Sequence, residues 1–421
     1  MPSTRFASDE DSYYQVATAL LQGRQDVFWP PLTGWLIALV RLITGSDSVA
    51  IVRLAWIVMD TICAAAIYAL GMRLGHAIWR DAPARATRLA QGATVGYALY
   101  LPAISHAQFA TSEIPALLAT LILVLLVTTG HASFGRFSAA GAVAGLASLT
   151  RPSLLPLLVF VPAAVAYRRR ASYAAAATCM VVGGLVVGAF VLRNWSYAGE
   201  ATISTNSAYN LYIGNRDMYA EDLNLFDPRA TAEQIEFRRR QMDGTAPPFT
   251  LSPAESQRLA LQWIREHPIQ FARRALGRLA RVFVPKTDVL ELLGGEKRAG
   301  VFAPASIALL AAANVEWALV LFGGLIGWFI LRHRDQRMAR VFAAVIAGAL
   351  VLCLVAISKP RYSFVFDPIL MLCAVVAWLE RDRLGALLTR TDRRSLAAMF
   401  AFLLWGWVAF AIFAVTSRTA M

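Results

Sequence analysis

Charged residues are scarce in this sequence. They make up 16% of its 421 residues, whereas a soluble globular domain carries about 25%. Hydrophobic residues reach 57%, and apolar runs of about eighteen residues or more recur along the chain, which is the pattern of membrane-spanning helices. The shortage of charge therefore excludes a string of soluble domains and predicts one all-α, polytopic transmembrane bundle.

Cysteine is also rare, and its placement excludes two kinds of site. The four cysteines are Cys63, Cys179, Cys353 and Cys373. Each lies inside an apolar run without a CxxC or Cys/His spacing, so we expect buried inert thiols and neither disulfides nor a metal site. The first fifteen residues, MPSTRFASDEDSYYQ, are polar and acidic, which is not the pattern of a signal peptide.

The net charge of +13 could suggest a nucleic-acid partner. Most arginines, however, lie in short segments between apolar runs, where basic residues set the orientation of a membrane protein. No basic stripe with interleaved aromatic residues occurs outside those runs, so no nucleic-acid partner is predicted.

Ten apolar runs are candidate spans. They are 49–73, 89–104, 112–130, 137–150, 153–167, 173–192, 304–331, 338–357, 363–379 and 396–417. The fourth and fifth are short and separated only by Arg151-Pro152, so they could instead form one broken helix. Two separate helices keep Arg136 and Arg168–Arg170 on the same side of the membrane, and loop charge therefore favours ten spans.

Loop charge also predicts which loops face the cytoplasm. The basic loops contain Arg80, Arg85, Arg88, Arg136, Arg168–Arg170, Arg332, Arg334, Arg337, Arg381, Arg383, Arg390, Arg393 and Arg394. The positive-inside rule places these in the cytoplasm. The acidic N-terminus, 105–112, Arg151, 193–302 and 358–362 are then extracytoplasmic. We expect a multi-pass protein of the cell inner (plasma) membrane with its active site on that outer side.

Four regions follow from this pattern. They are an acidic first extracytoplasmic loop with an interfacial helix (1–48), an N-terminal transmembrane bundle (49–192), a large extracytoplasmic loop (193–302) and a C-terminal transmembrane bundle (303–421). The apolar stretch 30–44 is too short to cross and fits an interfacial or re-entrant helix. In the large loop, a Pro-rich linker at 245–253 precedes an amphipathic stretch, 254–284, that suits a membrane surface and that Pro268 kinks or divides.

The acidic cluster Asp9-Glu10-Asp11 is the first candidate for chemistry. Carboxylates beside Tyr13 and Tyr14 on an outer membrane surface could act as a general base, as metal ligands or as acceptors for substrate hydroxyls. The alternative is a solvated acidic N-terminus without a role in catalysis.

The positive-inside rule does not explain basic residues on the outer side, so their presence there requires another explanation. Arg151, Arg193, Lys359 and Arg361 all lie at span ends, and a donor phosphate at the outer interface would supply that reason. Arg151 could instead snorkel to the interface. Glu113, at the outer start of a span, could either bind substrate or only stabilise its helix through the helix dipole.

Polar and aromatic side chains near these cations suit the faces and hydroxyls of a sugar. The candidates for substrate binding are Tyr13, Tyr14, Glu113, Asn194, Asn210, Asn215 and Tyr362. Acids near a lipid-phosphate site predict glycosyl transfer from a polyprenyl-phosphate sugar: a base takes the proton of the acceptor hydroxyl, and cations stabilise the departing phosphate. No cofactor is required, and a divalent metal is compatible with the acids but not predicted.

Several motifs occur in the order found in one family of membrane enzymes. They are Asp9-Glu10-x-x-Tyr13-x-x-x-Ala17, Leu20-Leu21-x-Gly23, Trp29-Pro30-Pro31, Thr111-Ser112-Glu113, Arg151-Pro152, Arg193-Asn194, His267-Pro268 and Arg361-Tyr362. Across most of its length the sequence resembles the GT-C superfamily of membrane glycosyltransferases, in the branch with protein O-mannosyltransferases and aminoarabinose transferases. The resemblance implies a polyprenyl-phosphate-sugar donor and a catalytic carboxylate in the first outer loop.

That catalytic role maps to Asp9, with Glu10 beside it, although Asp11-Ser-Tyr-Tyr14 offers a second register. Members of the branch are mostly thought to need no metal. They normally begin with a transmembrane helix before the acidic loop, whereas this sequence begins at that loop. Either the natural start lies upstream, which we expect, or this protein lacks that helix.

Two other functions compete with this interpretation. One is a polysaccharide polymerase or ligase with a diphosphate-linked donor, against which the acid-x-x-Tyr motif argues. The other is a transporter or flippase for a lipid-linked sugar, which predicts ionisable groups at mid-membrane; Asp60 and Glu316 are the candidates. For the enzyme, the expected partners are the lipid-linked donor, membrane lipids and a lipid, glycan or protein acceptor.

Overall fold

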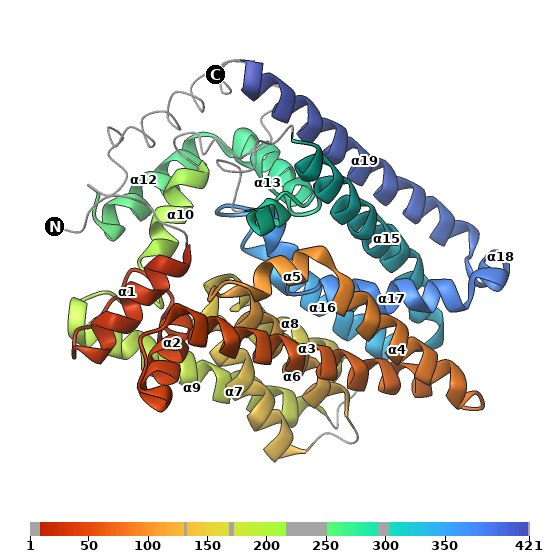
Figure 1. Ribbon diagram of the computed structural model, residues 1–421, viewed down its shortest axis with the longest axis horizontal. Helices are drawn as coiled ribbons and strands as arrows, with labels where there is room; N and C mark the ends of the chain where they lie inside the picture. The colour runs from red at the N-terminus through yellow and green to blue at the C-terminus, as the bar shows by residue number, and fades with distance from the viewer. Residues whose placement is uncertain (1–8, 130–132, 168–171, 216–250, 294–302, 420–421) are drawn as a thin grey trace.

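The computed structural model describes residues 9–129, 133–167, 172–215, 251–293 and 303–419, and these residues contain helices but no β-strand (Figure 1). The first half consists of α1 (Asp9–Leu21), α2 (Pro31–Thr44), α3 (Val49–Ile78), α4 (Pro83–Leu99), α5 (Leu101–Ala107), α6 (Glu113–Thr128), α7 (Phe134–Thr150), η1 (Pro152–Leu154), α8 (Leu157–Ala166) and α9 (Tyr173–Ala198). The second half consists of α10 (Asn206–Asn215), α12 (Pro253–Glu266), α13 (Pro268–Val282), η3 (Asp288–Leu293), α15 (Pro304–Arg334), α16 (Gln336–Val351), η4 (Pro360–Ser363), α17 (Asp367–Leu379), η5 (Arg381–Arg383), α18 (Leu384–Leu387) and α19 (Arg390–Thr419).

Nine of the ten apolar runs each correspond to one helix, whereas the run 89–104 is divided between α4 and α5 at the extended residue Tyr100. The helices differ in length. In the described residues, four helices are long and apolar enough to cross a membrane: α3, α9, α15 and the Arg390–Ala411 part of α19. By contrast, α6 has 16 residues and is about 24 Å long, against about 30 Å for the hydrocarbon core of a bilayer. The chain is therefore a helical membrane protein, and the count of ten spans stays a prediction.

The helix break expected at Arg151-Pro152 is present. Helix α7 ends at Thr150, and Arg151 is extended (φ −143°, ψ 108°). Proline disfavours the helical conformation of the residue before it, which explains why the break falls there. A short 3-10 turn, η1, then leads into α8.

Glycine contacts show the direction of the helices on either side of α8. A Cβ on Gly141 would lie 2.3 Å from the Cys179 carbonyl oxygen, and one on Gly145 would lie 3.0 Å from that of Gly183. The residue numbers of the two contacts increase together along both helices, so α7 and α9 run parallel. Helix α8, which lies between them in the sequence, runs in the opposite direction. Small residues at these positions let the backbones approach closely, as is common between membrane helices. The prediction of two separate helices around Arg151 is confirmed.

The same arrangement recurs in the second half. A Cβ on Gly324 would lie 2.8 Å from the Leu370 carbonyl oxygen, and one on Gly327 would lie 1.7 Å from that of Cys373. Helices α15 and α17 therefore run parallel, and α16 returns between them. Each half of the bundle thus contains a close pair of parallel helices joined by an antiparallel one.

The loops with excess arginine meet at one end of the bundle, named here the basic end. Glu380 lies 3.4 Å from Arg85 and 3.9 Å from Arg334, while Asp392 lies 2.9 Å from Arg332 and 2.8 Å from His333. The turns after α3, α15 and α17 therefore share one end, as loop charge predicts. Its assignment to the cytoplasm is the prediction from charge, and Arg168–Arg170 lie outside the described residues.

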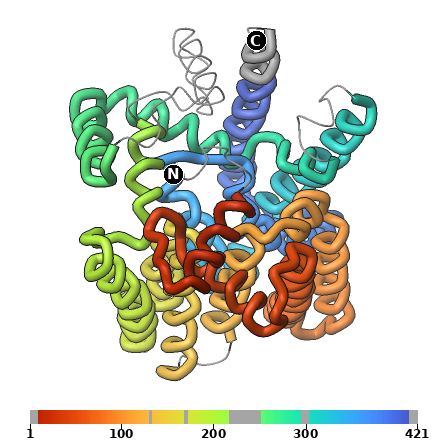
Figure 2. Tube along the Cα trace, turned by 60° about the vertical axis from the view of Figure 1, so that its left-hand side comes forward, coloured from red at the N-terminus to blue at the C-terminus, as the bar shows by residue number. Residues whose placement is uncertain are grey.

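Two amphipathic segments cover the opposite end. Figure 2 shows α1 and α2, in red, lying across the front of the helices that follow them. Helices α12 and α13 meet at Pro268, so the division expected there is confirmed. Helix α13 exposes Ile269 and Leu276 (67% and 56%) while it buries Arg278 completely. An outward apolar face of this kind suits a membrane surface.

Candidate active site

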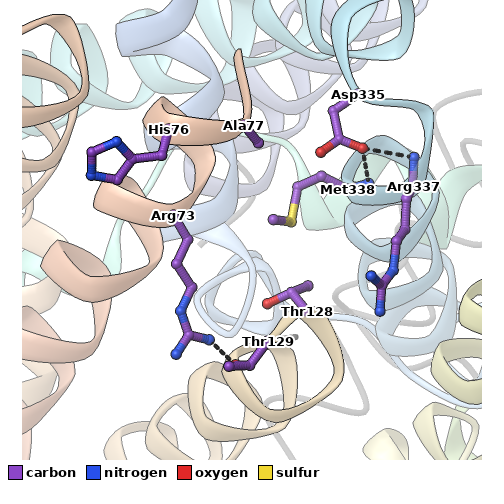
Figure 3. Close-up of a pocket in the computed structure, with 8 residues that line it drawn as sticks. All are labelled: Arg73, His76, Ala77, Thr128, Thr129, Asp335, Arg337 and Met338. Atoms are coloured by element: carbon purple, nitrogen blue, oxygen red, sulfur yellow. Dashed lines mark hydrogen bonds between the residues drawn. The ribbon is translucent and has the colours of Figure 1, made fainter. Parts of the chain in front are cut away.

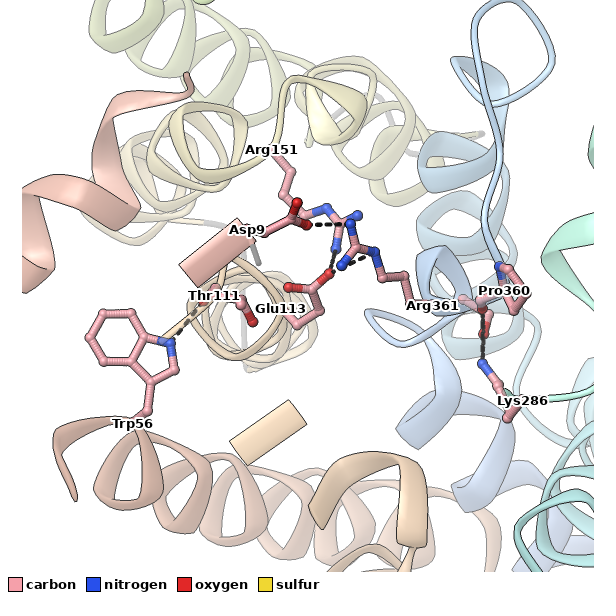
Figure 4. A network of polar contacts seen from close by, with 9 residues as sticks. Asp9, Trp56, Thr111, Glu113, Arg151, Lys286, Pro360 and Arg361 are labelled. Carbon is pink, nitrogen blue, oxygen red and sulfur yellow. Dashed lines mark hydrogen bonds and ion pairs between the residues drawn. The ribbon is translucent and has the colours of Figure 1, made fainter. Parts of the chain in front are cut away.

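Asp9, the first residue of α1, forms an ion pair with Arg361 of η4 (Figure 4). Their side chains are partly exposed, at 36% for Asp9 and 24% for Arg361. The two residues are separated by 352 positions in the sequence, so only the packing of α1 across the end of the bundle brings them together. The structure thus joins the first acidic candidate to one of the four predicted phosphate-binding cations.

Glu113 connects Arg361 to a second predicted cation. Its Oε1 atom lies 3.1 Å from Arg151 Nη1 and 3.4 Å from Arg361 Nε. Glu113 is the first residue of α6 and is buried to 1% exposure, and a carboxylate at that position is also favoured by the helix dipole. Arg151 reaches it from the extended residue between α7 and η1. The site therefore contains two carboxylates and two guanidinium groups in one chain of contacts, which Figure 4 shows.

Aromatic side chains pack around this charged chain. The Arg151 guanidinium lies 4.7 Å from the centre of the Tyr362 ring, a cation–π contact. Tyr13 is buried, and its ring lies 5.5 Å from that of Trp29. Tyr13 stands one helical turn after Asp9, so the two share a face of α1.

The neighbouring acids of α1 have different surroundings. Glu10 is buried, lies 2.5 Å from Arg53 and accepts a hydrogen bond of 2.9 Å from the Ala110 backbone N–H. Glu10 therefore connects α1 to α3 and to the segment before α6. Asp11 is exposed to solvent. Of the three acids, Asp9 and Glu10 face the bundle and Asp11 faces away.

A cavity of about 340 Å³ opens beside Asp9 and Arg361. It is lined by Asp9, Glu10, Ser105, His106, Phe109, Thr111, Arg281, Thr287, Asp288, Glu291, Lys359, Pro360 and Arg361. Its size is in the range of small-molecule sites. Lys359 has no ion-pair partner among the described residues, so it adds a positive charge to a wall in which Asp9 and Arg361 neutralise each other.

The ionisation of the site follows from these contacts. Arg361, and to a lesser extent Lys359, lowers the pKa of Asp9 against the opposing effect of burial. Burial alone would lower the pKa of Arg361, but Asp9 and Glu113 outweigh it and raise that pKa. Burial lowers the pKa of His106, so its imidazole is neutral at pH 7. At neutral pH the cavity therefore presents ionised Asp9, cationic Arg361 and a neutral imidazole.

Sequence reasoning missed several residues at this site. Lys286 is buried and donates a hydrogen bond of 3.1 Å to the carbonyl of Pro360, next to Arg361 (Figure 4). Asp288 lines the cavity, and its Oδ2 atom is buried and has no hydrogen-bond partner among the described residues. His106 lies in the segment 105–112, which loop charge predicts to be extracytoplasmic, and this predicted side is the signal in the sequence that could have indicated it. Lys286 and Asp288 follow an Arg-rich helix, and nothing in the sequence marks them as site residues.

Arg193 and Asn194 lie outside the cavity lining. Arg193 stacks on Phe190 and Trp35 at 4.9 and 5.6 Å from the ring centres and donates a hydrogen bond of 3.0 Å to Asn194. Asn194 is fully buried and donates in turn to the Thr202 carbonyl at 2.8 Å. This pair holds the end of α9 to the segment that follows it.

The other predicted substrate-binding residues also lie apart from the cavity lining. Asn215 is fully buried and donates hydrogen bonds of 2.8 Å to the Leu211 and Val355 carbonyls, which join α10 to the segment after α16. Asn210 is half-buried on α10. The Tyr14 hydroxyl donates to the Val49 carbonyl at 3.5 Å. Within the described residues, no group of three His, Cys, Asp or Glu side chains could hold a metal ion.

No family model and no curated protein matches the sequence. Among solved structures, the chain is similar to the archaeal oligosaccharyltransferase AglB from Archaeoglobus fulgidus, in complex with an inhibitory peptide and a dolichol-phosphate. The sequence identity is 13% and the TM-score 0.48, and the match covers 97% of this chain and 51% of that chain. This chain therefore spans about half the length of that structure.

Proposed function

We propose that this protein is a glycosyltransferase that moves a sugar from a polyprenyl-phosphate donor to an acceptor at the end of the bundle opposite the basic end. The observation that carries the proposal is the Asp9–Arg361 ion pair on the wall of the cavity. It combines a carboxylate that can take a proton with a guanidinium that can bind a phosphate in one small volume.

Among the described residues, Lys359 is a cavity-lining cation that forms no ion pair, and this supports a phosphate ligand. Asp9 and Glu113 neutralise Arg151 and Arg361, so Lys359 leaves a net positive charge among these groups. A polyprenyl phosphate that projects from the membrane would meet Lys359 and Arg361 together. The same cations would stabilise the charge that develops on the leaving phosphate.

Donor binding would also activate the base. A phosphate on Arg361 competes with Asp9 for the guanidinium, and the loss of that interaction raises the pKa of Asp9. Asp9 then takes the proton from an acceptor hydroxyl as its oxygen bonds to the anomeric carbon. The bond from the anomeric carbon to the phosphate oxygen breaks, and polyprenyl phosphate leaves with the bonding electrons. Without the donor, Arg361 keeps the pKa of Asp9 low, so Asp9 is a weak base.

The finer features of the proposal come from the sequence. They are membership of the GT-C superfamily in the protein O-mannosyltransferase and aminoarabinose transferase branch, an inner-membrane location and an extracytoplasmic site. Two observations support these features. The motifs that contain Asp9, Glu113, Arg151 and Arg361 occur in the order of the family, and these four residues meet at one end of the structure.

The groups that would favour a transporter are separate in the described part of the bundle. Asp60 accepts a hydrogen bond of 2.5 Å from the Tyr97 hydroxyl, and Glu316 accepts one of 2.9 Å from the Leu101 backbone N–H. Each carboxylate thus has a local partner, and no ion pair links them into a pathway. These contacts do not favour a transport function.

Asp9→Asn and Asp11→Asn form a matched pair that tests the proposal. Both remove one negative charge from the first turn of α1, but only Asp9 faces the cavity. We expect Asp9→Asn to lower sugar release about 10²- to 10⁴-fold, the usual contribution of a general base, and Asp11→Asn to change it less than about twofold. The probes are undecaprenyl phosphates that carry mannose, glucose or 4-amino-4-deoxyarabinose, each with purified membranes as the acceptor source.

Three outcomes would contradict the proposal. Full turnover in Asp9→Asn with loss in Asp11→Asn would show that the register of the base is wrong. Movement of the lipid-linked sugar across sealed vesicles without cleavage would identify a transporter. Turnover of only diphosphate-linked donors would identify a polymerase or ligase.

A further inference from the structure

Helix α13 has the reverse of the polarity expected on a surface that faces water. Ile269, Ala272 and Leu276 are exposed and share one side of the helix, because they are spaced by three and four positions; they are named here the apolar stripe. Arg278, on the other side, is completely buried and donates hydrogen bonds of 2.7 and 2.8 Å to two backbone carbonyls. A helix that faces water turns its charged side outward and its apolar side to the protein. The outer side of α13 therefore fits an apolar environment.

The preceding helix, α12, has the ordinary polarity and provides a comparison within the same segment. Its Ala260 is completely buried. Its exposed residues beyond the first turn are mostly polar: Gln257, Arg258, Leu261, Gln262, Arg265 and Glu266. Gln262 also donates a hydrogen bond of 2.8 Å to Glu266 on this outer side. The sequence pattern predicts a membrane surface for the whole stretch 254–284, but of the two helices it is α13 that turns its apolar side outward.

The basic end of the bundle provides a reference level for the position of α13. Helix α15 ends there just before Asp335, whose side chain accepts hydrogen bonds of 2.9 and 3.0 Å from the Arg337 and Met338 backbone N–H groups and so caps α16 (Figure 3). Arg332 of α15 lies 2.9 Å from Asp392 of α19. Loop charge predicts that this end lies at one surface of the membrane, so distances along α15 and α19 can be counted from the Arg332–Asp392 ion pair.

Two tryptophans give the distance from that ion pair to the end of α13. The carbonyl of Phe283, the residue after α13, accepts hydrogen bonds of 3.2 Å from Trp317 and 2.7 Å from Trp407. Trp317 precedes Arg332 by 15 residues on α15. Trp407 follows Asp392 by 15 residues on α19, so both helices give about 22 Å. Because the hydrocarbon core of a bilayer is about 30 Å thick, Phe283 lies near its opposite boundary, where tryptophan is enriched.

The last turn of α13 packs against α19 at the same level. A Cβ on Gly406 would lie 3.3 Å from the Ala280 methyl group, and Phe402 and Phe410 pack against Ala280 and Val284. Figure 1 shows α13 beside the ends of α15 and α19 that lie away from α18. Helix α13 is therefore attached to two helices that are long and apolar enough to cross a membrane.

We propose that α13 lies in the interface of the bilayer opposite the basic end, with the apolar stripe among the lipid acyl chains. The partner of this surface is the phospholipid itself. Arg273 is exposed beside the stripe, and its long side chain would extend from the apolar region to the lipid phosphates. Helix α12, with its polar outer side, lies in water above the headgroups.

This position sets the level of the candidate active site. Arg281 follows the buried Arg278 by one helical turn and lines the cavity beside Asp9 and Arg361. One helix thus faces lipid on one side and the cavity on the other, which places the cavity at the level of the lipid phosphates. The phosphate of a lipid-linked donor would lie at that level too. This consequence rests on the proposed function, whereas the position of α13 in the bilayer does not.

Spin labels on single introduced cysteines test the position of α13. Ile269→Cys and Leu276→Cys carry the label on the apolar stripe, and Gln262→Cys carries it at a matched exposed position on α12. The full chain is reconstituted in nanodiscs of phosphatidylethanolamine and phosphatidylglycerol. Collisions are measured with molecular oxygen, which concentrates in lipid, and with a water-soluble nickel chelate. The native cysteines are buried, and the wild-type protein treated with the same label gives the background.

We expect the two labels on α13 to collide more with oxygen than with the chelate, and the label on Gln262→Cys to show the reverse. Equal exposure of all three labels to the chelate would show that α13 faces water and would overturn the proposal. A label on Leu276→Cys that neither reagent reaches would overturn it as well, because protein, either a partner or a second copy, would then cover the stripe. Ala272→Cys replaces either α13 variant that fails to fold. The measurement uses no donor, so its result is separate from the test of the proposed glycosyl transfer.

Discussion

The ammonium group of Lys286 lies 3.2 Å from the Asp367 carboxylate, and the two side chains are only 1% and 0% exposed. Lys286 also lies 4.2 Å from the centre of the Trp317 ring and donates to the Pro360 carbonyl. It thus connects the segment after α13 to the start of α17 and to the turn that carries Arg361. This buried ion pair therefore helps to position η4, the turn that carries Arg361.

The first prediction concerns this pair. Lys286→Met should destabilise the protein by about 3–5 kcal/mol, because it leaves the Asp367 charge buried without a positively charged partner. Lys286→Met/Asp367→Asn removes both charges and should recover part of that loss, since an amide can still accept the 3.1 Å hydrogen bond from Tyr100. Thermal unfolding in detergent measures both. An unfolding temperature of Lys286→Met equal to that of the wild type would show that the pair is not needed.

The second prediction concerns the pH dependence of the proposed reaction. Arg361 lowers the pKa of Asp9, so Arg361→Gln should raise it and move the acid limb of kcat/KM to higher pH. Arg361→Lys keeps the positive charge and should leave the limb close to its wild-type position. The measurement is donor turnover between about pH 3 and pH 8, a range that includes the usual aspartate pKa of about 3.9. An acid limb that is the same in all three proteins would exclude Asp9 as the group that titrates.

The same contact makes stability depend on pH, with a sign that follows from linkage. The pKa of Asp9 is lower in the folded state than the unfolded value of about 3.9. Its contribution to stability is therefore fully present above that value and is lost as the pH falls through the folded-state pKa. The difference in unfolding temperature between wild type and Asp9→Asn should be constant near neutral pH and shrink below about pH 4.

The third prediction concerns donor binding. Lys359→Gln should weaken the binding of undecaprenyl phosphate about 10- to 150-fold, in line with a charge-assisted hydrogen bond of about 1.5–3 kcal/mol. Arg24→Gln is the matched control, because Arg24 is an exposed cation on the loop after α1 that contacts Gln22 and not the cavity. Equal losses in the two variants would show that general surface charge, and not Lys359, attracts the lipid.

The helices and the ends of the bundle could be predicted because local properties determine them. Apolar runs mark the helices, Pro152 marks the break at Arg151, and loop arginines mark the basic end. Loop charge also predicts that Asp9, Glu113 and Arg361 lie on one side of the membrane, and the structure brings these three residues together.

Local sequence properties could not decide which of the neighbouring acids Asp9 and Asp11 faces the bundle. The acid-x-x-Tyr pattern begins either at Glu10, next to Asp9, or at Asp11. Asp9 and Asp11 point to different faces of α1. The packing of Tyr13 and Glu10 against the bundle decides which face is inward. The Lys286–Asp367 pair likewise joins residues 81 positions apart, and a single sequence contains no signal for such a pairing.

The fourth prediction uses two adjacent glycines of α9. A Cβ on Gly183 would lie 2.1 Å from a Leu158 methyl carbon and 2.7 Å from the Gly141 carbonyl oxygen, whereas one on Gly184 would meet nothing within 4 Å. Gly183→Ala should therefore force α7, α8 and α9 apart and destabilise the protein by about 1–3 kcal/mol, the usual cost of overpacking.

Gly184→Ala adds the same methyl group one position away, on the open side of the helix. Because alanine also has the higher helix propensity, this variant should be neutral or slightly stabilising. Thermal unfolding of the two purified variants in the same detergent compares them directly. Equal unfolding temperatures would mean that α7 and α9 do not pack through Gly141 and Gly183, and the parallel arrangement of these two helices would lose its support.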